Sequence, residues 1–289
     1  MQILMNGVIQ GLLLALAGMG FALVYNATGI FHIAQGVIFA GTPFILLACI
    51  QGGLGLPMGI GLSLAAAIIV SCLYEVGNHG PLQKKEASKE IHLIASLGAY
   101  IALVQVIVII WGNETQVLRS GVDATFSFAG IILTRSQLLG GATAVAVLSA
   151  FLFWLWRTNI GLRFRALSDN PTQLALMGYN IRMLRLAIFA LSGLLTATVA
   201  LLMALDIGFD PHGGLQIVLL AMVATIIGGR GSFLGPVIGA ILLGILRSQV
   251  VWYTSARWEE AATFFLLVLF LFLRPQGLFG WAGRLETQP

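Results

Sequence analysis

The side chains that most often carry chemistry are few in this sequence and widely spread along it. The four histidines are His32, His79, His92 and His212. They are far apart and form no metal-binding pattern such as H-E-x-x-H. Cys49 and Cys72 lie singly in apolar segments, which predicts two small core residues rather than a disulfide framework. We therefore predict no catalytic residue, no metal site and no enzyme activity.

The glycine-rich segment GGRGSFLG, Gly228 to Gly235, is the nearest approach to a phosphate-binding loop. It lacks the lysine and the preceding strand that a nucleotide-binding loop requires, so we predict no nucleotide or other cofactor on this chain. Successive glycine amides could bind a carboxylate instead. This makes a substrate pathway one interpretation of Gly229, Arg230, Gly231 and Ser232. The alternative is that Arg230 anchors a cytoplasmic turn.

A further set of polar residues lies in the segment GLRFRALSDNPTQLALMGYNIRMLR, Gly161 to Arg185, between two apolar runs. Asn170, Pro171 and Gln173 are typical of a helix start, and Gly178 is typical of a helix end. A helix of about seven residues is shorter than the ~12 to 15 residues that a helix needs to persist alone in water. It must therefore pack against something.

The apolar residues of this short helix suggest what it packs against. Leu174 and Met177 share one face, Ala175 lies beside them, and Arg163 and Arg165 precede the helix. One interpretation is a docking knob for another protein. The other is a surface helix that rests on its own membrane domain or on lipid headgroups.

Composition defines the elements that carry these residues. The 289 residues are 58% hydrophobic and only 9% charged, with a mean hydropathy of +0.97. Such a chain is a polytopic membrane protein, and without the alternation of a barrel it must cross the bilayer as helices. The predicted fold is a single all-α transmembrane domain over residues 1–289. The charge of +4 follows short loops and has no interleaved aromatics, which argues against nucleic acid as a partner.

Apolar runs predict eight or nine crossings. The predicted spans are Gly7–Tyr25, Gly29–Ile50, Leu56–Val76, His92–Trp111, Gln137–Leu155, Leu186–Leu205, Leu215–Ile227, Pro236–Trp252 and Ala262–Leu273. The second and seventh could be broken or re-entrant. Close glycine spacing, as in Gly7 and Gly11, predicts tight helix crossings.

Lysine and arginine set the predicted orientation. With nine spans, eleven lie on one side, namely Lys84, Lys85, Lys89, Arg157, Arg163, Arg165, Arg182, Arg185, Arg230, Arg274 and Arg284. Only Arg119, Arg135 and Arg257 lie on the other. The positive-inside rule places the first group, with the loop at about residues 156–185, in the cytoplasm. We predict a multi-pass protein of a bacterial plasma (inner) membrane, surrounded by lipid.

Several motifs resemble one family in the right order. The stretch from Gly161 to Asp206 resembles the cytoplasmic loop and following helix of ABC importer permeases for branched-chain amino acids, the LivH type. GIFHIAQG, TIIGGRGSFLGPVIGAILLG and PQGLFG are similar to its other elements. The resemblance covers nearly the whole chain. A departure is that the family's Asn and His in the second segment appear here as His32 and Gln35.

The resemblance implies roles and partners. The short helix would be the coupling helix that docks on an ATPase subunit, through Arg163, Arg165, Asp169, Leu174, Ala175, Met177 and Gly178. The solute pathway would involve His32, Gln35 and Gly36 as well as the glycine segment. Implied partners are a second homologous permease, two cytoplasmic ATPases that bind the ATP, and an extracytoplasmic binding protein that delivers a small neutral solute.

Other functions remain open at this point. A branched-chain or other neutral amino acid leads as substrate, with urea or short amides as alternatives in the same family. A stand-alone secondary transporter or channel would move solute without an ATPase. A scaffold subunit would show no dependence on solute.

Overall fold

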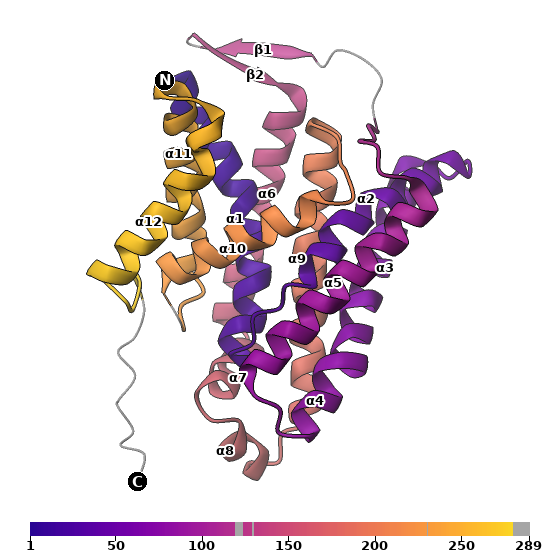
Figure 1. Ribbon diagram of the computed structural model, residues 1–289, viewed down its shortest axis with the longest axis vertical. Helices are drawn as coiled ribbons and strands as arrows, with labels where there is room; N and C mark the ends of the chain where they lie inside the picture. The colour runs from indigo at the N-terminus through magenta and orange to yellow at the C-terminus, as the bar shows by residue number, and fades with distance from the viewer. Residues whose placement is uncertain (119–123, 129, 230, 280–289) are drawn as a thin grey trace.

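The computed structural model describes residues 1–118, 124–128, 130–229 and 231–279, and these are almost entirely helical, as predicted. The helices form an elongated bundle (Figure 1). They are α1 (Gln2–Thr28), α2 (Gln35–Gln51), α3 (Leu56–Tyr74), the π-helical turn η1 (Glu75–His79), α4 (Gly80–Lys84), α5 (Lys89–Trp111), α6 (Arg135–Arg157), α7 (Asn159–Asp169), α8 (Pro171–Leu176), α9 (Ile181–Asp206), α10 (Gly213–Gly228), α11 (Gly235–Tyr253), the 3₁₀ turn η2 (Ala256–Trp258) and α12 (Glu259–Leu273).

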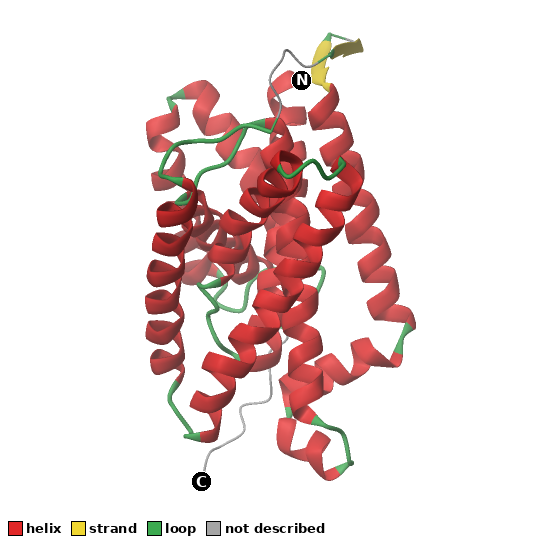
Figure 2. Ribbon diagram, turned by 90° about the vertical axis from the view of Figure 1, so that its right-hand side faces the viewer, coloured by secondary structure: helices red, strands yellow, loops and turns green. Residues whose placement is uncertain are grey.

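The strands of the described part form one small hairpin that the sequence did not predict. Strands β1 (Thr125–Phe128) and β2 (Ile131–Thr134) pair antiparallel, with Thr125 opposite Thr134. Figure 2 shows this hairpin, in yellow, projecting beyond one end of the bundle. Thr134 then caps α6, because its hydroxyl accepts a hydrogen bond from the backbone N–H of Gln137.

Each of the nine predicted spans coincides with a helix. In the described ranges, six helices are long and apolar enough to cross a membrane: α1, the continuous helix Leu56–Lys84, α5, α6, α9 and α11. Helices α2 and α10 are apolar but shorter. The exact number of crossings stays a prediction.

The second segment is interrupted, as the sequence allowed. Residues Gly29 to Ala34 leave the helix, and α2 begins only at Gln35. Gly29 has a φ of 68°, a conformation that glycine adopts without steric cost, and its N–H bonds the carbonyl of Tyr25. The break places His32 between two helices rather than within one.

Helix α1 forms the centre of the bundle and is buried on all sides along most of its length. Its closest partner is α11. A Cβ on Gly11 would lie 2.7 Å from the Cα of Ile241, and one on Gly244 would lie 2.5 Å from the Cα of Gly11. The predicted tight crossing at Gly7 and Gly11 is therefore confirmed, since only glycine lets these backbones approach so closely.

Helix α3 and its π-helical extension bury one narrow stripe with a spacing of four residues. Its members are Gly59, Ser63, Ala67, Ser71, Glu75 and His79. Most of the other residues of α3 are exposed apolar side chains, as expected for a helix that faces lipid. The π turn carries Glu75 and His79 into the interior, and such turns often occur at functional sites.

The basic connections gather at one end of the bundle. Figure 1 shows α4, α7 and α8 together at the end opposite to the N-terminus and the hairpin. Lys84, Arg163 and Arg165 belong to these elements. The arrangement agrees with the grouping of loops that the charge count predicts.

Candidate functional site

Helix α8 begins and ends where the sequence predicts. The side chain of Asn170 accepts a hydrogen bond from the backbone N–H of Gln173 over 3.0 Å, and Pro171 occupies the first helical position. Gly178 has a φ of 85° just after the helix. The helix spans six residues, so packing must hold it.

The packing of α8 separates its apolar residues into two sets. Leu174 is only 4% exposed and belongs to the main hydrophobic core, where it anchors the helix. Met177 is 73% exposed and Leu176 is 83% exposed. The sequence spacing suggested that Leu174 and Met177 share one exposed ridge. That prediction was wrong, because Leu174 is buried. The exposed pair is Leu176 and Met177, flanked by the exposed Ala175 and Gly178.

Helix α7, which sequence reasoning missed as a separate element, supports α8 and places the two arginines. Phe164 and Leu167 face the core. The guanidinium carbon of Arg163 lies 4.8 Å from the ring centroid of Tyr179, and that of Arg165 lies 5.7 Å from the ring centroid of Phe233. These cation–π contacts join α7 to the segment after α8 and to the loop between α10 and α11.

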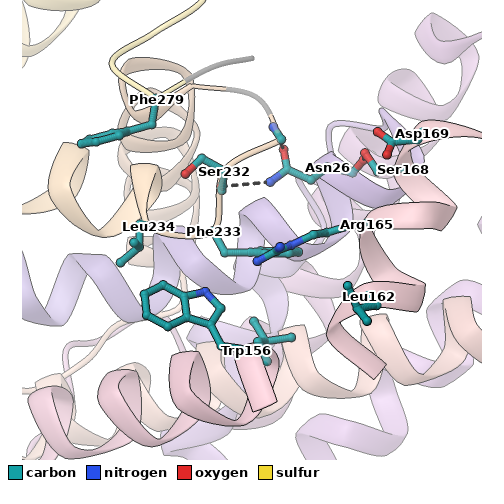
Figure 3. Close-up of a pocket in the computed structure, with 12 residues that line it drawn as sticks. Asn26, Trp156, Leu162, Arg165, Ser168, Asp169, Ser232, Phe233, Leu234 and Phe279 are labelled. Atoms are coloured by element: carbon teal, nitrogen blue, oxygen red, sulfur yellow. Dashed lines mark hydrogen bonds between the residues drawn. The ribbon is translucent and has the colours of Figure 1, made fainter. Parts of the chain in front are cut away.

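A cavity of about 750 Å³ lies beside α7, at the end of the bundle that carries the basic loops (Figure 3). It is lined by Asn26, Leu155, Trp156, Leu162, Arg165, Ser168, Asp169, Gly231, Ser232, Phe233, Leu234 and Phe279. The cavity brings together predicted coupling residues, Arg165 and Asp169, with predicted pathway residues, Gly231 and Ser232. Nothing in the sequence placed these two groups side by side.

Asn26, at the end of α1, connects the walls of this cavity. Its side-chain amide donates to the carbonyl of Ser232 over 3.3 Å, and its side-chain oxygen accepts from the N–H of Gly231 over 3.1 Å. Its backbone carbonyl accepts from the hydroxyl of Ser168 on α7. Sequence reasoning missed Asn26, although an amide in the last turn of an apolar helix is a signal of this kind.

The C-terminal motif completes this region. The N–H groups of Leu278 and Phe279 bond the carbonyls of Ile227 and Gly228 at the end of α10, over 2.8 and 3.0 Å. A Cβ on Gly277 would lie 2.4 Å from the Cα of Gly229, so the two segments are in backbone contact. Arg230, predicted for the pathway or for a cytoplasmic turn, lies outside the described residues.

The other predicted pathway residues lie apart from this cavity, inside the bundle. His32 and Gln35 are buried, and the side-chain amide of Gln35 donates to the hydroxyl of Thr196 on α9. A Cβ on Gly214 would lie 2.0 Å from the carbonyl oxygen of Gly36. Gly36 therefore marks the crossing of α2 with α10.

Three of the histidines, which are widely separated along the sequence, meet in the interior. Nδ1 of His79 lies 2.9 Å from Nδ1 of His92, and Nε2 of His79 lies 3.2 Å from Nδ1 of His32. His79 uses a different nitrogen toward each neighbour, so the rings form a row and do not converge on one point. Among the described residues, no group of three or more His, Cys, Asp or Glu could hold a metal ion.

A buried ion pair lies near this row. Nε and Nη2 of Arg185 donate to Oε1 and Oε2 of Glu75 over 2.5 and 3.1 Å, and both residues are less than a tenth exposed. The sequence placed Arg185 in a cytoplasmic loop. That prediction was wrong, because the π turn of η1 and the first turns of α9 bring Arg185 and Glu75 together inside the protein.

In the part of the chain that the structure describes, three buried side-chain atoms have no hydrogen-bond partner: Nε2 of His32, Oε1 of Gln35 and Oγ of Ser192. Most buried polar atoms in proteins are paired. Two of these atoms belong to residues that the sequence assigns to the solute pathway.

A bundle of lipid-facing helices with buried polar groups, and a capped basic loop at one end, are the features of a multi-pass membrane protein. The family described as "Branched-chain amino acid transport system / permease component" matches residues 3–273. The chain belongs to this family, which consists of permease components rather than enzymes.

Relatives match over nearly the full chain. BraD, a high-affinity branched-chain amino acid transport system permease protein of Pseudomonas aeruginosa, is 24% identical over 97% of this chain and 95% of its own length. LivH of Escherichia coli K12, described in the same words, is also 24% identical, with the same coverage. A probable LivH permease of Methanocaldococcus jannaschii is 25% identical over 96% of this chain and 92% of its own.

A solved structure shares the fold. PsaBC from Streptococcus pneumoniae, in complex with Fab, superposes with a TM-score of 0.53 and 13% identity, over 96% of this chain and 93% of that chain. At this identity the likeness concerns the fold alone.

Proposed function

We propose that this chain is a membrane subunit of an ATP-driven importer for branched-chain or other neutral amino acids. The complex would hold a second permease, two cytoplasmic ATPase subunits and an extracytoplasmic binding protein. The ATPases would bind the ATP, and this chain would need no cofactor of its own. The names of the relatives support the substrate class. The observation that carries the proposal is the arrangement of buried and exposed apolar residues on α8.

Helix α8 has the features of a part that transmits movement. Leu174 fixes it to the core, while Leu176 and Met177 are left exposed at the basic end. Large exposed apolar side chains beside charged residues favour contact with another protein. We infer that they enter a groove of an ATPase subunit.

Contacts behind α8 give movement a route to the solute pathway. From α7, Arg165 contacts Phe233 and Ser168 bonds Asn26, which in turn holds Gly231 and Ser232. A shift of the coupling loop would therefore reshape the cavity wall. Differential contacts of this kind are what a switch between two states requires.

The unpaired atoms of His32 and Gln35 support a role in the pathway. In this conformation they are buried and unsatisfied, which costs free energy. A polar solute or water that enters during transport would pair them. The two groups of pathway residues would then act at different depths of the same route.

The test is the double substitution Leu176→Glu and Met177→Glu in the assembled complex in proteoliposomes, with radiolabelled leucine as solute. We expect loss of uptake and loss of solute-stimulated ATP hydrolysis, because charge cannot enter an apolar groove. Lys85→Gln with Lys89→Gln is a matched control, since it changes the net charge by the same amount at exposed residues of the same end that do not line the cavity beside α7. Normal uptake by the α8 variant would refute the docking role.

The same assay tests which solute is transported and whether transport needs the ATPase subunits. Uptake of urea but not leucine would overturn the amino acid assignment. Uptake by the purified chain without ATPases would show a stand-alone transporter instead.

A further inference from the structure

A second, smaller cleft lies at the basic end, between the end of the continuous helix Leu56–Lys84 and the start of α9. Its volume is about 290 Å³. The residues that line it include Glu75, Val76, Lys84, Arg182 and Arg185. It shares no residue with the cavity beside α7.

The cleft is positively charged. Lys84, Arg182 and Arg185 contribute three positive charges, and Glu75 contributes one negative charge, which leaves a net charge of +2. Glu75 accepts from Nε and Nη2 of Arg185, so the N–H groups of Nη1 are not used in that pair. Lys84 and Arg182 are exposed at the rim. Such a group of donors suits a phosphate.

The surroundings of the cleft are those of a membrane surface. On the same helix, Leu73 and Val76 are exposed apolar residues, and Met183 is exposed on α9. These side chains face lipid in a membrane-spanning chain. Lys84 lies about two turns beyond Val76 toward the basic end, and Arg182 directly precedes Met183. A ligand that fits both parts has an anionic head and an apolar tail.

We propose that this cleft binds the phosphate of an anionic glycerophospholipid. Lys84 and Arg182 contact the phosphate, Arg185 donates from its free edge, and an acyl chain lies along Val76 and Leu73. Basic pockets between helices at the cytoplasmic surface are suited to such headgroups. The exposed apolar strip beside the charges favours a lipid over free phosphate. The site is independent of what the chain transports.

The experiment is native mass spectrometry of the purified full chain mixed with phosphatidylglycerol or phosphatidylcholine. The test variant is Lys84→Gln with Arg182→Gln. The control is Lys85→Gln with Lys89→Gln, which removes the same charge from exposed residues that do not line the cleft. We expect the test variant to retain phosphatidylglycerol about tenfold less than the unmodified chain and the control to remain within twofold.

Other outcomes overturn the proposal. Equal losses in both variants would mean general attraction between a basic loop and anionic lipid. Displacement of the lipid by millimolar inorganic phosphate would mean a site for a free anion. Unchanged lipid retention, with weaker capture of the ATPase subunits, would mean a site for an acidic protein surface. Thermal unfolding of both variants in detergent checks that the chain remains folded.

Discussion

The side chain of Asn26 donates a hydrogen bond to the carbonyl of Ser232, 206 residues later in the sequence. The two residues belong to the central helix and to the loop between α10 and α11. Because Asn26 also bonds Gly231 and accepts from Ser168, it joins three segments that border one cavity. This junction connects α7 to the central helix and to the loop between α10 and α11.

Replacing Asn26 by alanine should uncouple the cavity wall from α1. The side-chain bonds to Gly231 and Ser232 would be lost, and a typical bond of this kind contributes about 0.5 to 1.5 kcal/mol. We expect leucine uptake by the complex to fall at least tenfold. Asn113→Ala, at an exposed amide, is the control. Full uptake by Asn26→Ala would contradict the role of the junction.

Removing one partner of the Glu75–Arg185 ion pair should destabilise the protein more than replacing both partners. Glu75→Gln leaves a buried cation without its counter-charge and should lower the free energy of unfolding by about 3 to 5 kcal/mol. The double variant Glu75→Met, Arg185→Met should lie much closer to the unmodified chain. Thermal unfolding in detergent measures both. A double variant less stable than Glu75→Gln would show that the charges themselves hold the fold.

The middle histidine of the row should be the most sensitive. His79→Ala leaves nitrogens of both His32 and His92 unpaired, whereas His92→Ala leaves only one on His79. Each buried nitrogen left without a hydrogen-bond partner costs about 1 to 3 kcal/mol, so His79→Ala should be the more destabilising change. His212→Ala, at an exposed ring, should have little effect. Equal melting temperatures for the His79 and His92 variants would speak against a connected row.

A methyl group at the crossing of α2 and α10 should not be tolerated. In Gly214→Ala the new Cβ would lie 2.0 Å from the carbonyl oxygen of Gly36, so the helices must separate, at a cost of about 1 to 3 kcal/mol. Gly61→Ala is the control, because nothing lies within 4 Å of a Cβ there. That change should be neutral or slightly stabilising, since alanine favours a helix. Loss of stability in Gly61→Ala alone would reverse the expectation.

Local signals explain what the sequence could predict. The cap at Asn170 and the stop at Gly178 depend on neighbours within a few residues, and so both could be located in advance. The spans follow from apolar runs, and Gly7 and Gly11 from their spacing. The family followed from the order of several motifs.

Contacts between distant segments explain the rest. The row of histidines requires the break before α2, the π turn after α3 and the start of α5 to meet, and no spacing along the chain records this. The same holds for Asn26 with Ser232. Helix α7 was missed because its arginines were interpreted as markers of orientation, although its buried residues Gly161, Phe164 and Leu167 recur every three positions. Leu174 was assigned to the wrong surface, because periodicity does not say which face is covered.

The central place of α1 also constrains how the protein is made. Translation delivers this helix before α11, yet the surface that carries Gly7 and Gly11 packs against α11, which is synthesised more than two hundred residues later. Until then α1 must be shielded by lipid or by the insertion machinery. The bundle therefore closes only after α11 has been made, and a chain that stops before Gly235 lacks the partner that covers its own core.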